Sequence, residues 1–171
     1  MNKLFRTTAL AALLLAALPA AHAANQNYSF NGALDSGALI GQTFSGSFSF
    51  DDAALSSSGT EWLSVSSLSM NFAGSNFTQA NAAAGSAVEV AYLDGSFLGL
   101  SYSVDSSFPK FSVIPGYDHV SQAFVAYDTA AVGGSGTGNI NFAPVPEPES
   151  YAMLLAGLGL MGMVARRRKA L

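Results

Sequence analysis

The stretch FSGSFSF, residues 44–50, places phenylalanine or glycine at every second position and serine between them. Successive side chains of a β-strand point to opposite faces, so this alternation predicts a strand with one buried and one solvated face. The runs VSSLSMNF at 65–72 and VEVAYL at 88–93 alternate in a similar way. The sequence therefore indicates a domain built from strands.

Turn residues separate the alternating runs, and Gly74-Ser75-Asn76 is one of the predicted turns. Asp94-Gly95 stands between two such runs and predicts a two-residue hairpin with a type I′ turn. Further strands are predicted at 28–30, 97–104, 111–114, 123–127 and 138–142. Eight or nine short strands at this spacing favour an all-β fold, an antiparallel β-sandwich or jelly-roll-like domain over residues 24–143.

Charge is unevenly spread along the chain. Residues 24–150 carry all eleven acidic residues and only one of the seven basic residues, Lys110, for a net charge of −10. This charge disfavours binding to nucleic acid and to anionic membranes. The absence of cysteine excludes disulfides, thiolate metal sites and cysteine nucleophiles. No motif in the sequence requires a cofactor, and we expect none.

The N-terminus has the three regions of a cleavable export signal. Lys3 and Arg6 precede an apolar run at 9–18, and Ala21-His22-Ala23 follows with small residues at the positions that signal peptidase reads. The apolar run is shorter than the roughly 20 residues of a membrane span. We therefore expect residues 1–23 to be a signal peptide that is cut after Ala23.

The C-terminal tail, residues 144–171, joins a proline-rich segment to an apolar stretch and a basic end. Prolines at 144, 146 and 148 hold the first segment extended, and the uncharged stretch 151–165 predicts a helix. At 1.5 Å per residue this helix would be only about 22 Å long, short of a hydrocarbon core of about 30 Å. It would cross the inner membrane only with the arginines of the basic end snorkelling. The basic end favours a cytoplasmic C-terminus and consists of Arg166, Arg167, Arg168 and Lys169.

Residues 145–171, paired with a signal peptide, closely resemble the PEP-CTERM sorting signal of Gram-negative bacteria. The resemblance implies that Pro146, Glu147 and Pro148 are recognised by an exosortase, a membrane cysteine transpeptidase that cuts or transfers the chain near this motif. It implies an inner-membrane-anchored precursor, delivery to the cell surface or the extracellular space, and a role beside exopolysaccharide in biofilm, floc or matrix. The alternative interpretations of the tail are an ordinary single-span anchor and a fortuitous hydrophobic helix.

The central domain offers few patterns typical of catalysis. Glu61 and Glu89 are the candidate pair of carboxylates for a glycosidase, although a glutamate on a strand more often faces solvent. His119 lacks any distinctive nucleophile and orienting acid in the sequence, so we interpret it as an exposed loop histidine. Asp51 and Asp52 are more typical of a solvated turn than of a calcium site.

Two classes of function follow from these observations. The first is a non-enzymatic surface or matrix protein sorted through its tail. The alternative is a carbohydrate-binding or carbohydrate-cleaving module. Exposure of Trp62 together with two tyrosines on one sheet face would favour binding, and two carboxyls facing each other across a groove would favour cleavage.

Overall fold

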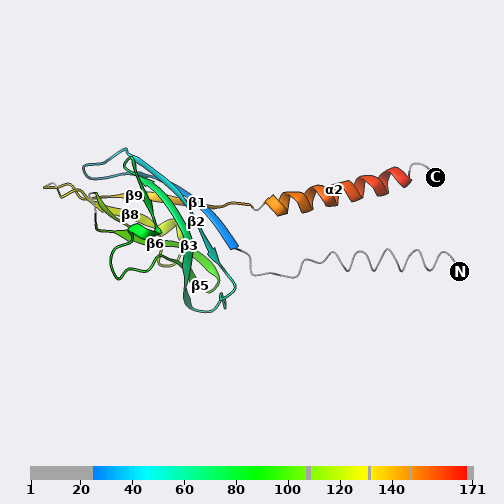
Figure 1. The fold of residues 1–171 in the computed structure, drawn as a ribbon, viewed down its shortest axis with the longest axis horizontal. Coiled ribbons are helices and arrows are strands. Elements are labelled where there is room, and N and C mark those ends of the chain that lie inside the picture. The colour runs from blue at the N-terminus through cyan, green and yellow to red at the C-terminus, as the bar shows by residue number, and fades with distance from the viewer. Residues whose placement is uncertain (1–24, 107–108, 131, 147, 169–171) are drawn as a thin grey trace.

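The computed structural model describes residues 25–106, 109–130, 132–146 and 148–168 (Figure 1). The predicted signal peptide, residues 1–23 with Ala21 and Ala23, lies outside the described residues. Glu147 of the sorting motif and Lys169 of the basic end also lie outside them.

The described residues form nine strands, two short 3₁₀ helices and one long helix. In chain order they are β1 (Asn25–Leu34), β2 (Thr43–Asp51), β3 (Thr60–Phe72), β4 (Ser75–Thr78), η1 (Gln79–Asn81), β5 (Glu89–Leu93), β6 (Ser96–Val104), β7 (Lys110–Ile114), η2 (Val120–Gln122), β8 (Phe124–Asp128), β9 (Gly136–Pro144) and α2 (Pro148–Arg168). Each predicted strand corresponds to one of these strands. β4 is an addition, because it lies where the sequence indicated only a turn.

Eight antiparallel strands close into a barrel. Their order is β2-β1-β9-β8-β7-β6-β5-β3, and β3 returns to pair with β2, while β4 pairs with β3 outside this ring. The predicted all-β, antiparallel class is confirmed. The predicted sandwich or jelly roll is corrected to a closed barrel, because β2, at one end of this order, also pairs with β3 and so leaves the ring without a sheet edge.

Aromatic rings fill the inside of the barrel. An eight-stranded barrel has an interior just wide enough for side chains to fill. Phe48 is 3% exposed, and its ring centroid lies 5.6–6.4 Å from those of five other rings. These rings belong to Tyr28, Phe30, Phe50, Phe97 and Phe142. The phenylalanines of the alternating stretch 44–50 are therefore the core, as their period of two predicted.

The hairpin predicted at Asp94-Gly95 is present between β5 and β6. Leu93 pairs with Ser96, and Asp94 and Gly95 have φ angles of +48° and +77°. A type I′ turn requires positive φ at both central residues, so the prediction of this turn is confirmed.

The two ends of the barrel domain lie on neighbouring strands. Tyr28 of β1 pairs with Pro144 of β9, and the Val145 N–H donates a hydrogen bond of 2.7 Å to the carbonyl oxygen of Asn27. The tail therefore leaves the barrel beside the strand that begins the domain.

Helix α2 projects away from the barrel (Figure 1). It has 21 residues, so it is longer at both ends than the uncharged stretch 151–165 that predicted it. The side chains of residues 151–162 are all exposed. In the part of the chain that the structure describes, no helix is both long and apolar enough to cross a membrane.

Candidate functional site

The sorting segment of the tail connects the barrel to α2. Val145 is fixed to β1 through its hydrogen bond to Asn27, Pro146 is exposed, and Pro148 is the first residue of α2. The fixed φ of proline suits the first turn of a helix, where its missing N–H has no partner to lose. The two prolines of the motif thus mark the end of the folded barrel and the start of the helix.

The basic end lies at the far end of α2 from this segment. Arg166, Arg167 and Arg168 are the last three residues of the helix. At 1.5 Å per residue, 21 residues give a helix of about 32 Å, so the arginines stand far from the prolines. This order of extended segment, apolar helix and basic terminus is the one that the sequence predicted.

The comparison with known families bears on this tail. A family model for the PEP-CTERM protein-sorting motif matches residues 144–169. The chain carries a PEP-CTERM sorting motif. This motif implies export, an exosortase as the processing partner, and sorting to the cell surface. The match begins at the last residue of β9, so it does not extend to the rest of the barrel.

No curated protein and no solved structure matches the chain.

Glu61 and Glu89 lie on opposite faces of the sheet. Glu61 pairs with Tyr92, whose side chain is buried in the core, whereas Glu89 lines a groove on the outer surface. The carboxylate of Glu61 accepts backbone hydrogen bonds from Ser56 at 2.7 Å and Ser58 at 3.3 Å. These bonds, with that from Ser56 the strongest, lower the pKa of Glu61. The structure therefore does not assemble the carboxylate pair considered for a glycosidase.

His119 is exposed in the loop between β7 and β8, as we interpreted it from the sequence. Gln122 organises this loop. Its side-chain oxygen accepts hydrogen bonds from the backbone N–H groups of Tyr117, Asp118 and His119 at 3.1, 2.8 and 3.2 Å. Sequence reasoning missed Gln122, because a glutamine in a loop carries no distinctive signal.

Asp51 and Asp52 take part in local hydrogen bonds at the end of β2. Asp51 accepts a bond of 2.9 Å from the N–H of Ala53, and Asp52 accepts one of 2.8 Å from the side chain of Gln26. Among the described residues, no group of three or more histidine, cysteine, aspartate or glutamate side chains is placed to hold a metal ion. The geometry at Asp51 is that of an aspartate turn.

The tyrosines of the strands point into the barrel. Tyr92, Tyr102 and Tyr127 belong to the core, and burial raises the pKa of Tyr102 to about 12 and raises the pKa of Tyr92 as well. Tyr117 is 85% exposed but lies in the loop that Gln122 organises. The pattern of Trp62 with two tyrosines on one sheet face is therefore not formed.

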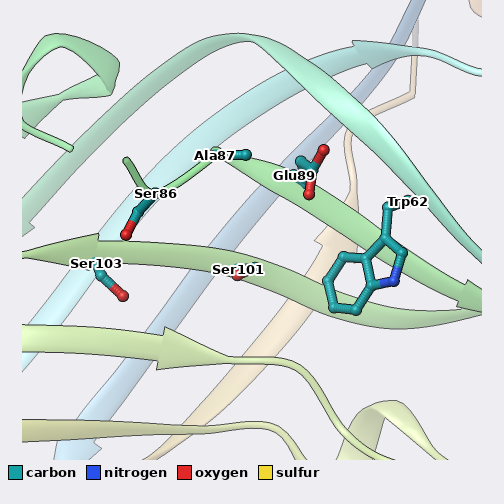
Figure 2. Close-up of a pocket in the computed structure, with 6 residues that line it drawn as sticks. All are labelled: Trp62, Ser86, Ala87, Glu89, Ser101 and Ser103. Carbon is teal, nitrogen blue, oxygen red and sulfur yellow. The ribbon is translucent and has the colours of Figure 1, made fainter. Parts of the chain in front are cut away.

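Trp62 itself stands on the outer face of the barrel and is 49% exposed. Beside it lies a shallow groove of about 300 Å³ over β3, β5 and β6 (Figure 2). The groove is lined by Trp62, Ser86, Ala87, Glu89, Ser101 and Ser103. Sequence reasoning named Trp62 and Glu89 but missed the serines, since serine is abundant throughout this domain.

A second groove lies over β9, β1, β2 and β3 and has a volume of about 510 Å³. Cross-strand pairing places Asn141, Asn31, Ser45 and Asn71 in one row across these four strands. The groove is lined by Asn31, Gly32, Ala33, Thr43, Phe44, Ser45, Asn71 and Asn141. It is uncharged, and its one aromatic residue, Phe44, is buried in the core.

Proposed function

We propose that the mature chain is a non-enzymatic protein of the cell surface or extracellular matrix, associated with exopolysaccharide in biofilm or floc. The observation that carries this proposal is the PEP-CTERM motif, fastened directly to a closed barrel by the bond from Val145 to Asn27. The barrel is the part of the chain that this sorting route delivers.

In this route signal peptidase removes residues 1–23. Helix α2 and its basic end hold the precursor at the inner membrane while the exosortase acts near the Pro-Glu-Pro motif. The bias of basic residues toward the cytoplasm places the barrel on the other side of the membrane.

The outer surface of the barrel suits contact with a hydrated neutral polymer. On β2 and β3 the outward positions pair Ser47 with Ser69, and both side chains are exposed. A hydroxyl both donates and accepts hydrogen bonds, as do the hydroxyls of sugars, and the net negative charge of the domain does not repel a neutral polymer.

Fractionation of the native host tests the association with exopolysaccharide. We expect the protein to sediment with the extracellular matrix and to be released when the polysaccharide is digested enzymatically. A strain that makes no exopolysaccharide is the control, and in it the protein should appear in the soluble fraction. Equal recovery in the soluble fraction of both strains would contradict the proposal.

A further inference from the structure

We propose that the outer groove beside Trp62 binds a neutral polysaccharide chain. This inference rests on the proposed association with exopolysaccharide and gives that association a site. One exposed indole, the polar side chains around it and the charge of the domain point to this ligand.

Trp62 supplies the apolar surface of the site. About half of its surface is exposed, and burying that apolar surface against a ligand would be favourable. Its cross-strand neighbour is Ala91, which pairs in turn with Gly99. The exposed half of the indole borders the groove, where the C–H face of a sugar ring can pack flat against it.

The polar side chains supply the hydrogen bonds that a sugar requires. Glu89 pairs directly with Ser101, and both line the same groove as the indole (Figure 2). Among the residues that the structure describes, the Glu89 carboxylate and the Ser101 and Ser86 hydroxyls have no hydrogen-bond partner. They are therefore available as acceptors and donors for the hydroxyl groups of a ligand.

The charge of the domain selects a neutral polymer. The stretch 24–150 carries eleven acidic residues and one basic residue, and Glu89 stands within the groove. An acidic polysaccharide would bring carboxylates beside Glu89 and into the negative potential of the barrel, which repels them. A neutral chain avoids this repulsion and still offers hydroxyls to the carboxylate.

The shape of the groove suits a segment of an extended chain. Its volume of about 300 Å³ is at the lower end of the range of ligand sites, and it is open rather than enclosed. The second groove, over β9, β1, β2 and β3, is larger, but it lacks an exposed aromatic ring. The combination of an exposed ring with unpaired polar groups therefore favours the groove at Trp62.

Intrinsic fluorescence gives a direct test, because Trp62 is the only tryptophan of the chain. The chain purified from its host would be titrated with the host's neutral exopolysaccharide, a soluble neutral β-glucan, and alginate as an acidic polymer. We expect a saturable change in tryptophan emission with the host's neutral polysaccharide and none with alginate. Binding measured independently by affinity electrophoresis should weaken at least tenfold in Trp62→Ala and less in Trp62→Phe and Glu89→Gln.

Two control variants, Tyr117→Ala and Asn31→Ala, remove an exposed aromatic side chain elsewhere and an asparagine of the second groove. Both should bind as the wild type does, and all variants should keep its circular dichroism spectrum. If Trp62→Ala binds the neutral polysaccharide as tightly as the wild type, the polysaccharide does not bind at Trp62, although the protein still associates with it. If the wild type binds none of the neutral polymers, the association itself fails. Tighter binding of alginate would overturn the choice of a neutral ligand.

Discussion

Phe30 lies directly across from Gly46 on the neighbouring strand, and its ring occupies the space that a Cβ atom at position 46 would need. The carbonyl oxygen of Ser69 closes the same space from the other side. Phe44 and Gly32 repeat the arrangement one pair further along the same two strands. Glycines inside the barrel therefore make room for the phenylalanine rings that fill it.

Gly46→Ala should destabilise the barrel by about 1–3 kcal/mol, because the added methyl group would press on the Phe30 ring and the Ser69 carbonyl. Urea unfolding followed by circular dichroism measures the change. The matched control is Ser47→Ala, which alters the exposed neighbour on the same strand and should shift stability by less than about 0.5 kcal/mol. Equal midpoints for Gly46→Ala and the wild type would contradict the packing described here.

Phe48→Ala should cost about 3–5 kcal/mol, because it removes a buried ring from contact with five others. The comparison is Phe124→Ala, since Phe124 is 36% exposed and its loss should cost clearly less. Both are best measured in a fragment of residues 24–143, which we expect to fold alone with a spectrum dominated by strand. A helical spectrum for this fragment would count against the fold.

The alternation of apolar and polar residues predicted the strands but not how they close. Inward and outward positions alternate in the same way in a sandwich and in a barrel. What decides between them is long-range pairing, as of Phe44 with Phe72 and of Tyr28 with Pro144, which local patterns do not specify. β4 was missed because Gly74-Ser75-Asn76 indicated a turn. The turn exists at Ala73 and Gly74, both with positive φ, and the strand starts directly after it.

The candidate site was also predictable only where it depends on local sequence and not on long-range pairing. The tail is a linear motif, so its residues are recognisable without a fold. Trp62 stands beside the inward-facing Leu63, which already indicates that it faces outward. Glu61 and Glu89 lie on opposite faces, and Glu89 lies across from Ser101, because of the register between the strands and their bulges. Local sequence does not specify this register, so only the structure shows these positions.

Alkaline pH should destabilise the barrel through Tyr102. Its hydroxyl donates a hydrogen bond of 2.7 Å to the carbonyl oxygen of Thr78, and burial raises its pKa to about 12. Because the pKa is higher in the folded state, the protonated Tyr102 hydroxyl contributes to the free energy of unfolding. This contribution is complete below the unfolded pKa of about 10 and is lost as the pH rises from about 10 to 12. Tyr92 acts in the same direction, because burial raises its pKa as well.

The check is the free energy of unfolding in urea across this pH range. The alkaline loss should be smaller in Tyr102→Phe than in the wild type. Tyr117→Phe is the control, because Tyr117 is exposed, and its alkaline loss should equal that of the wild type. If the free energy of unfolding of Tyr102→Phe falls with pH as steeply as that of the wild type, Tyr102 does not cause the alkaline loss.

Glu147→Gln separates recognition of the motif from hydrophobicity of the tail. The substitution keeps size but removes the charge between two prolines whose φ angles are fixed. If the exosortase recognises that charge, uncleaved precursor of the Glu147→Gln protein should accumulate in the inner membrane. Immunoblotting of membrane fractions would detect it. Neutral replacements of Arg166, Arg167 and Arg168 should instead disturb the orientation of the tail. Normal processing of Glu147→Gln with failure of the arginine variant would mean that the tail acts through topology alone.

Intact mass spectrometry of the protein from its host, with and without the exosortase, tests the sorting account most directly. With the enzyme present, we predict a mature species that begins at Ala24 and lacks the basic tail. Without the enzyme, the chain should begin at Ala24 and still end at Leu171. If chains from the normal host also end at Leu171, the exosortase does not process this protein, and its surface sorting would need another explanation.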